Sequence, residues 1–312
     1  MRLQAISAFC CATLFVAAFA QSESRTVVFD GLGNGRDWST VQTGDSRSNE
    51  TFRNLNGRRV PFESSEEKVI RNEGGVRIVE RISRRFDPNG NPLPPEKSIS
   101  ETTTRPDGSI AEKVTTYRGD INGALQPVER TTAEIRKSGS STQRETGIER
   151  KTLNGGFETV ERRVASETAT KDASERDETS YARDANGRFV EAWRTVVKAT
   201  ISGNEVREQT DEYDAATTGR LQLVRQAMAR TVKDPSGAER REVDVFGPAA
   251  QGRPIEANSP AQLRERQIFT TRPSSDGTVI QVYSVQRPTL NSPRELEPPR
   301  KVSETVCKGK CQ

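Results

Sequence analysis

Glycine returns along this chain with a period of 32 or 33 residues. One series comprises Gly57, Gly90, Gly123, Gly155, Gly187, Gly219 and Gly252. A second series, which includes Gly75, Gly108 and Gly277, lies about midway between these positions, so a turn falls roughly every 16 residues. Such regular self-similarity is typical of repeat architectures, and it constrains the fold more than any single motif does.

The residues at and between these turns favour β-hairpins. Asn-Gly or Asp-Gly stands at many of the turns, and a tight type I′ hairpin turn needs positive φ at its central residues. The segments between turns are rich in Thr, Val, Arg and Glu, and Val279–Tyr283 is strand-like. Pro127 interrupts one such segment and indicates a bulge or a strand start. The sequence predicts an all-β antiparallel meander of long hairpins with a 32–33-residue repeat, either an extended single sheet or a curled one.

Apolar residues after the turns follow the same period. Two series have 32-residue steps: Leu125, Phe157, Phe189 and Leu221, then Val128, Val160, Ala192 and Val224. Leu125 and Val128 differ in parity, so they face opposite sides of a strand unless a bulge lies between them. The chain is only 31% hydrophobic, which argues against a sandwich with a dense apolar core. The pattern favours a sheet that is wet on both faces, held by cross-strand pairs worth about 0.2–1 kcal/mol each.

Two other architectures compete with this prediction. A barrel embedded in lipid would share the long strands and the meander, but its outer face needs an apolar band. Here Arg, Lys and Glu occur at both parities in nearly every segment, which disfavours that alternative. Disorder is the second alternative, because the chain is 29% charged and its mean hydropathy is −0.78. The phased apolar positions favour a folded chain.

The N-terminus predicts export. Residues 1–20 read as a signal peptide, because Arg2 precedes an apolar run and Ala18-Phe-Ala20 matches a small-x-small cleavage pattern before Gln21. An uncleaved anchor is the alternative. Residues 21–50 fit the period poorly and are interpreted as a lead-in or capping segment. Residues 51–312 are predicted to form the β-hairpin repeat domain, with an insertion near 256–263.

Composition excludes several classes of function. The 48 basic and 44 acidic residues give a net charge of +4 and are interspersed, whereas nucleic-acid-binding proteins cluster their Lys and Arg. The chain contains no histidine, which removes Ser-His-Asp triads and imidazole metal sites. No cofactor and no transmembrane segment after signal cleavage are expected.

Two cysteines are the clearest candidate for a covalent site. Cys307 and Cys311 flank Gly309 and are the thiols that remain after the predicted signal cleavage. In an exported protein such a pair favours a structural disulfide, here across the last turn. A redox pair or an intermolecular link is an alternative, and two thiolates without histidine make a poor zinc site.

Two further patterns each allow a functional and a structural interpretation. Asp-x-Asn-Gly occurs at Asp87–Gly90, Asp120–Gly123 and Asp184–Gly187; its oxygens resemble the start of a calcium loop, but a hairpin turn is favoured because no later carboxylate completes a ligand set. The aromatic residues could form a ligand-stacking ladder or simply pack along the sheet. They are Tyr117, Phe157, Tyr181, Phe189, Trp193 and Tyr213.

The turn motifs carry a resemblance to a known family. Tyr213-Asp214 with Gly219-Arg-Leu221, and Tyr181 with Gly187-Arg-Phe189, resemble the YD (Rhs-type) repeats. Phe86-Asp-Pro-Asn-Gly90 is similar as well. The resemblance implies strand-and-turn repeats in an exported protein, often arranged as a curved β shell. It covers the turn motifs only, and no functional residue is transferred.

These observations together predict an exported structural or interaction protein of the cell envelope or surface, and not an enzyme. The expected partner is a protein or an anionic glycan, and edge-to-edge self-association is a further expectation because unpaired sheet edges template association. The location would be the periplasm, the cell surface or the medium. The alternative is an envelope hydrolase that uses carboxylates, or a ligand-binding β shell.

Overall fold

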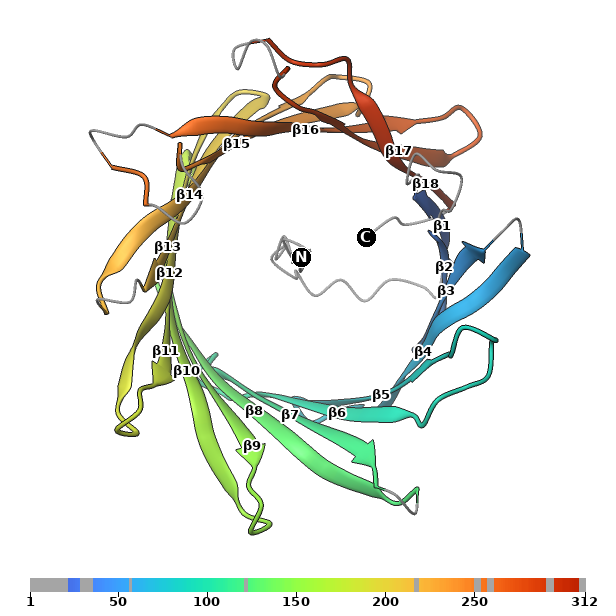
Figure 1. Cartoon of the computed structure of the whole chain (residues 1–312), viewed down its shortest axis with the longest axis vertical. Helices are drawn as coiled ribbons and strands as arrows, with labels where there is room; N and C mark the ends of the chain where they lie inside the picture. Colours follow the sequence, from blue (N-terminus) through green and yellow to red (C-terminus); the bar gives the residue numbers. More distant parts are fainter. Residues whose placement is uncertain are drawn as a thin grey trace.

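The chain forms a closed β-barrel. In a computed structural model, eighteen antiparallel strands follow one another around a single sheet, and the last strand pairs with the first (Figure 1). The structure describes residues 22–28, 36–55, 58–120, 123–215, 219–249, 254–256, 261–289 and 295–308, without the side chains of Ser22, Glu23, Trp38 and Leu55. The predicted signal peptide at 1–20 and Cys311 lie outside these residues.

The strands are long, as the turn spacing predicts. The first nine are β1 (Ser22–Val28), β2 (Arg36–Thr43), β3 (Ser46–Leu55), β4 (Arg58–Glu73), β5 (Val76–Arg85), β6 (Glu96–Thr104), β7 (Ile110–Gly119), β8 (Leu125–Ser138) and β9 (Ser141–Lys151). The others are β10 (Phe157–Ala169), β11 (Ala173–Arg183), β12 (Phe189–Ser202), β13 (Glu205–Ala215), β14 (Leu221–Lys233), β15 (Glu239–Gly247), β16 (Gln262–Pro273), β17 (Thr278–Gln286) and β18 (Arg300–Lys308).

The all-β antiparallel meander is confirmed, but the expectation of an extended or curled open sheet is wrong. β1 pairs with both β2 and β18, so residues 21–50, expected to be a lead-in or cap, contribute strands that close the barrel. Closure gives hydrogen-bonded neighbours to every described strand. The described sheet therefore has no unpaired edge strand for the expected edge-to-edge association. The proposed domain boundaries stay predictions, although the connection over 248–261 between β15 and β16 includes most of the insertion expected near 256–263.

The two ends of the barrel differ in their connections. At one end, called the turn end, Glu73 of β4 pairs with Val76 of β5, and Ser138 of β8 pairs with Ser141 of β9. Only two residues join the strands in each of these two hairpins. At the other end, called the loop end, the connections include 86–95, 248–261 and 287–299. The Asp-x-Asn-Gly motifs also lie at the loop end. Their geometry is a type I turn followed by a left-handed glycine rather than type I′, since Gly187 (φ 77°) donates to the carbonyl of Asp184.

A β-bulge near the loop end recurs in successive even-numbered strands. The register shifts leave one extra residue opposite the partner strand in each case: Val128 in β8, Val160 in β10, Ala192 in β12 and Val224 in β14. These residues form one of the two apolar series with 32-residue steps. A bulge bends its strand and increases the local twist, and repeated bulges of this kind help a sheet to close. Pro127 lies directly beside the first of them, as its position predicts.

Burial distinguishes the two faces of the wall. Most of the buried strand residues belong to one set of cross-strand partners: Ser65, Ala133, Ala165, Ser180, Ala227, Ala229, Val243, Val245 and Cys307. Their sequence neighbours on the opposite face are open, with Val164 41% and Met228 47% exposed. Side chains converge on the concave side of a barrel and diverge on the convex side. The buried set therefore marks the inner face.

Candidate functional site

The inner face carries ladders of ion pairs. Glu112 accepts a hydrogen bond from Arg144 at 2.7 Å across β8, and Glu208 accepts one from Arg241 at 2.8 Å across β14. Glu161 in β10 contacts both Arg163 at 2.6 Å and the buried Ser180 hydroxyl at 2.8 Å. Opposite charges at neighbouring positions stabilise a sheet that has few apolar residues to bury.

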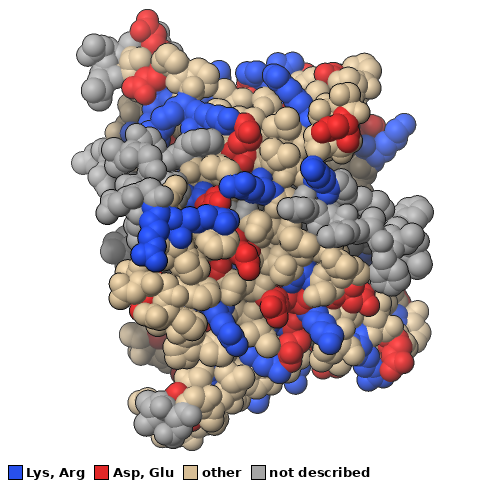
Figure 2. Space-filling model, turned by 90° about the vertical axis from the view of Figure 1, so that its right-hand side faces the viewer, with Lys and Arg blue, Asp and Glu red and all other residues tan. Residues whose placement is uncertain are grey.

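The outer face carries similar pairs. Arg230 and Glu205 lie 2.8 Å apart, Arg266 and Asp244 lie 2.6 Å apart, and Arg194 contacts Asp177. Figure 2 shows one side of the barrel, where basic and acidic side chains occur from one end of the described surface to the other. The outer wall is therefore a mixed-charge surface.

One repeat position on the outer face departs from this pattern. The Arg130 guanidinium lies 3.9 Å from the centre of the Phe157 ring. Thirty-two residues later, Arg162 lies 5.9 Å from the centre of the Phe189 ring, and Arg183 reaches the same ring at 5.3 Å. Phe157 and Phe189 are the first residues of β10 and β12. These two aromatic side chains, which the sequence singled out, therefore contact guanidinium groups. A cation over a ring face is worth about 0.5–1 kcal/mol at an exposed site.

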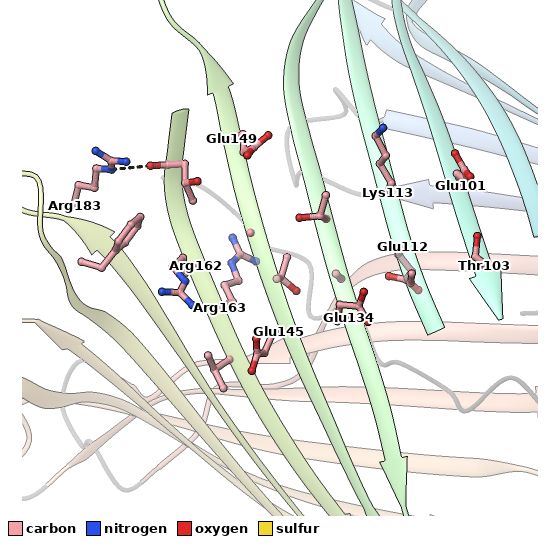
Figure 3. A pocket seen from close by; sticks show the side chains of 18 residues that line it. Glu101, Thr103, Glu112, Lys113, Glu134, Glu145, Glu149, Arg162, Arg163 and Arg183 are labelled. Carbon is pink, nitrogen blue, oxygen red and sulfur yellow. Dashed lines mark hydrogen bonds between the residues drawn. The ribbon is translucent and has the colours of Figure 1, made fainter. Parts of the chain in front are cut away.

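A groove of about 720 Å³ crosses the wall from β6 to β12; outer-face residues form most of its lining, which includes Arg162, Arg183 and Phe189 but not Arg130. Its floor contains small residues, among them Ala111 and Gly147. Figure 3 shows Glu134 and Glu145 in the middle of the groove, with Arg162 towards β11. Lys113 and Glu101 line the β6 side, Glu149 lies on β9 in the middle together with Glu145, and Arg183 of β11 lines the other side.

Charges within the groove differ in how they are compensated. Arg105 donates two hydrogen bonds to Glu134, at 2.9 and 2.8 Å. These bonds hold the pKa of the Glu134 carboxyl below its usual value. Arg183 donates from Nε to the carbonyl of Thr159 at 2.7 Å, drawn as a dashed line in Figure 3. Arg162, Arg183, Glu145 and Glu149 form no ion pair with any residue that the structure describes. The groove thus combines unpaired guanidinium groups with unpaired carboxylates.

The predicted calcium-like turns act as hairpin turns. The Asp87 carboxylate accepts hydrogen bonds from the backbone N–H groups of Asn89 and Asn91, both at 2.8 Å. Asp184 does the same for Asn186 and Arg188. The bonds from Asn91 and the neighbouring backbone lower the pKa of Asp87. Asp120 accepts a bond from Ala124, but the middle of its turn lies outside the described residues.

Cys307, one of the two cysteines of the predicted disulfide, lies at the closing seam of the barrel. Cys307 is 3% exposed on β18, between Ser24 of β1 and Val279 of β17. Cys311 lies outside the described residues, so the pairing of these two cysteines stays a prediction. Of the two interpretations of the aromatic residues, the ladder of stacked rings was not found in the described part of the chain. There, the closest ring pair is Phe269 with Tyr283, at 4.7 Å between ring centres.

The described residues contain neither a group of three or more metal-ligating side chains nor a helix long and apolar enough to cross a membrane. These observations leave the outer groove as the site with the most distinctive arrangement of charges. The sequence singled out Phe157 and Phe189 but not the arginines that stack on them. Arg130 and Arg162 nevertheless share the same 32-residue step.

Comparison with known proteins identifies the fold and no family. No family model matches the chain, and no curated protein matches it. A mutant of the Rh. blastica porin is 8% identical and has a TM-score of 0.51, with 93% of this chain and 98% of the porin covered. Two other structures are more distant. CdiB from Acinetobacter baumannii is 8% identical with a TM-score of 0.39, and the match covers 92% of this chain and 60% of CdiB. The FrpB iron transporter from Neisseria meningitidis is 9% identical with a TM-score of 0.35, and the match covers 88% of this chain and 62% of the transporter. This chain therefore has a large β-barrel fold similar to that of a porin.

Proposed function

We propose that this protein is an exported structural or interaction barrel of the cell envelope or cell surface, with water rather than lipid on both sides of its wall. The observation that carries the proposal is the set of ion pairs on the outer face, such as Arg230 with Glu205 and Arg266 with Asp244. Export is supported by the signal-peptide pattern at residues 1–20, and the porin-like fold fits an envelope protein.

The cost of inserting this wall into lipid supports the proposal. An Arg or Lys on the lipid face of a barrel costs about 2–4 kcal/mol at the midplane of the bilayer. The outer face presents such residues on strand after strand, for example Lys113, Arg162 and Arg194. A lipid-facing wall would need apolar residues at these positions. Water solvates both partners of each pair, so a water-exposed wall has no such cost.

A hydrolytic function has less support. The outer groove contains several carboxylates, which an acid–base mechanism would need. A general acid needs a raised pKa, however, and Arg105 lowers that of Glu134. We therefore favour an interaction surface over an active site at this place.

Detergent partitioning tests the proposal. The mature protein, beginning at Gln21, is expected to fold without detergent, to show a β-sheet circular dichroism spectrum, and to enter the aqueous phase of a Triton X-114 separation. An outer-membrane porin, treated in parallel, is the control that enters the detergent phase. Recovery of this protein in the detergent phase, or stepwise ion conductance after its addition to a planar bilayer, would contradict a water-exposed wall.

A further inference from the structure

We propose that the outer groove over β6–β12 binds an anionic polysaccharide, with Arg162 and Arg183 contacting its acidic groups. This inference rests on the proposed function, because the groove must face water. It adds the class of ligand, the surface that binds it and the residues that recognise it.

The first argument is the state of the two guanidinium groups. About half of the arginines in the described strands contact a carboxylate, and Arg163, next to Arg162 in the sequence, pairs with Glu161 on the inner face. Arg162 and Arg183 have no such partner among the described residues, and both are exposed. Their charge is therefore available to an external anion.

The second argument is that both groups are already oriented. Phe189 lies beneath the two guanidinium groups at 5.9 and 5.3 Å, and the Nε of Arg183 is fixed by its bond to the carbonyl of Thr159. That bond leaves the terminal N–H groups of Arg183 free to meet a ligand. A planar guanidinium matches the geometry of carboxylate, sulfate or phosphate, and holding it in place reduces the entropy lost on binding.

The third argument favours a sugar polymer over a nucleic acid. Glu145 and Glu149 lie in the same groove without an ion-pair partner among the described residues, and they would repel a backbone with a phosphate at every unit. Hydroxyl groups, in contrast, donate hydrogen bonds to carboxylates. A polysaccharide in which neutral sugars separate the acidic ones can place its acidic groups at Arg162 and Arg183 and its hydroxyls at the carboxylates of the groove.

The shape of the groove agrees with an extended ligand. It crosses the strands rather than following one of them (Figure 3). Its lining includes the small residues Ala111 and Gly147, which leave room between the longer side chains. An added peptide strand needs a free sheet edge, and the described sheet has none. A polymer that lies across the wall needs no edge.

Titration calorimetry with soluble polymers tests the inference. We expect the mature protein to bind hyaluronate, in which acidic and neutral sugars alternate, at low salt, to bind it more weakly as salt rises, and not to bind neutral dextran. The double variant R162Q/R183Q should weaken binding about tenfold or more, since each lost charge-assisted contact is worth about 1.5–3 kcal/mol in partly desolvated settings. The matched control is R230Q/R240Q, which removes the same net charge from arginines paired with Glu205 and Glu242, and its affinity should stay within about twofold of the wild type.

Each remaining outcome decides against the inference. Equal losses in both double variants would mean that total charge, not this groove, drives binding. Equal binding of poly-glutamate would point to an acidic peptide, and Arg162-dependent binding of phosphatidylglycerol vesicles would point to a lipid surface. A folded, aqueous protein that does not bind hyaluronate would overturn the inference alone, whereas partitioning into detergent would overturn the proposed function.

Discussion

Neighbouring residues of the same strand have opposite environments on the two faces of this wall. Ala165 is 9% exposed on the inner face of β10, whereas Val164, just before it, is 41% exposed on the outer face. In β14 Ala229 is 7% exposed and Met228 47%. The small residues are packed and the larger ones are open. The buried apolar material of this barrel is therefore concentrated, as small side chains, on the inside.

The strongest packing occurs at one place on the inner face. Ala227 and Ala229 of β14 contact Val243 and Val245 of β15 and form a cluster of buried residues. Elsewhere the wall depends on backbone ladders and ion pairs. Substitutions inside this cluster should consequently have larger effects than the same substitutions on the outer face.

The largest expected effect comes from placing one charge on each face. Val243→Asp places a carboxylate among the buried apolar residues of the cluster. This substitution should lower the free energy of unfolding by about 3 kcal/mol. Met228→Asp, on the adjacent strand but exposed, should change it by about 0.5 kcal/mol or less. Urea denaturation monitored by circular dichroism measures both values. Equal losses would show that the two faces are packed alike.

The contrast between crowded and open positions extends to the turns. Gly75 and Gly108 have similar left-handed φ angles of 75° and 80°. A Cβ atom at Gly75 would lie 2.8 Å from the carbonyl oxygen of Thr104, a backbone atom, while at Gly108 it would contact nothing within 4 Å. Gly108→Ala should cost about 1 kcal/mol for the backbone conformation. Gly75→Ala should cost clearly more in the same denaturation assay, and a smaller loss than for Gly108→Ala would contradict the close approach.

The smallest expected effect concerns a carboxylate on each face. On the outer face, hydrogen bonds from Arg230 and Arg207 lower the pKa of Glu205 from 4.5 to about 2. On the inner face, burial raises the pKa of Glu161, but hydrogen bonds from Arg163 and Ser180 outweigh burial and leave it lowered. Each group therefore contributes stability above its unfolded pKa and loses that contribution as pH falls through its folded pKa.

Two conservative variants separate these contributions. Unfolding curves of wild type and Glu205→Gln should differ near pH 5 and converge towards about pH 2, and about 1 M salt should reduce the difference because the pair is exposed. The difference for Glu161→Gln should persist in salt, since that carboxylate is partly buried. Equal salt sensitivity of the two variants would argue against distinct environments.

Much of the local structure could be predicted from the sequence, because turn chemistry acts over a few residues. The hairpin positions followed from the glycine spacing, and the Asp184 turn forms as expected from side-chain bonds to nearby backbone N–H groups. Pro127 indicated a bulge, and the bulge lies beside it. The strand order followed from the meander, since consecutive hairpins leave little choice of neighbour.

Closure could not be predicted in the same way, because it depends on twist summed over eighteen strands. Val128 and its repeats looked like thinly spread apolar residues, whereas they are the bulged residues that bend the strands. The groove was missed for a related reason. Arg162 and Phe189 lie 27 residues apart in the sequence and on strands β10 and β12, so only the register brings them together.

The seam between β1 and β18 has a consequence for how the protein is made. Thr26 and Thr305 share a hydrogen bond across this seam at a separation of 279 residues. During synthesis and export the N-terminal strand emerges first, yet its partner on one side emerges last. The first strand must therefore wait, unpaired on that side, until nearly the whole chain has been delivered, and contacts of such long range form slowly. A chain that is truncated near either terminus would keep most of its hairpins but would present two open edges to its neighbours, which makes incomplete copies the form most prone to aggregate.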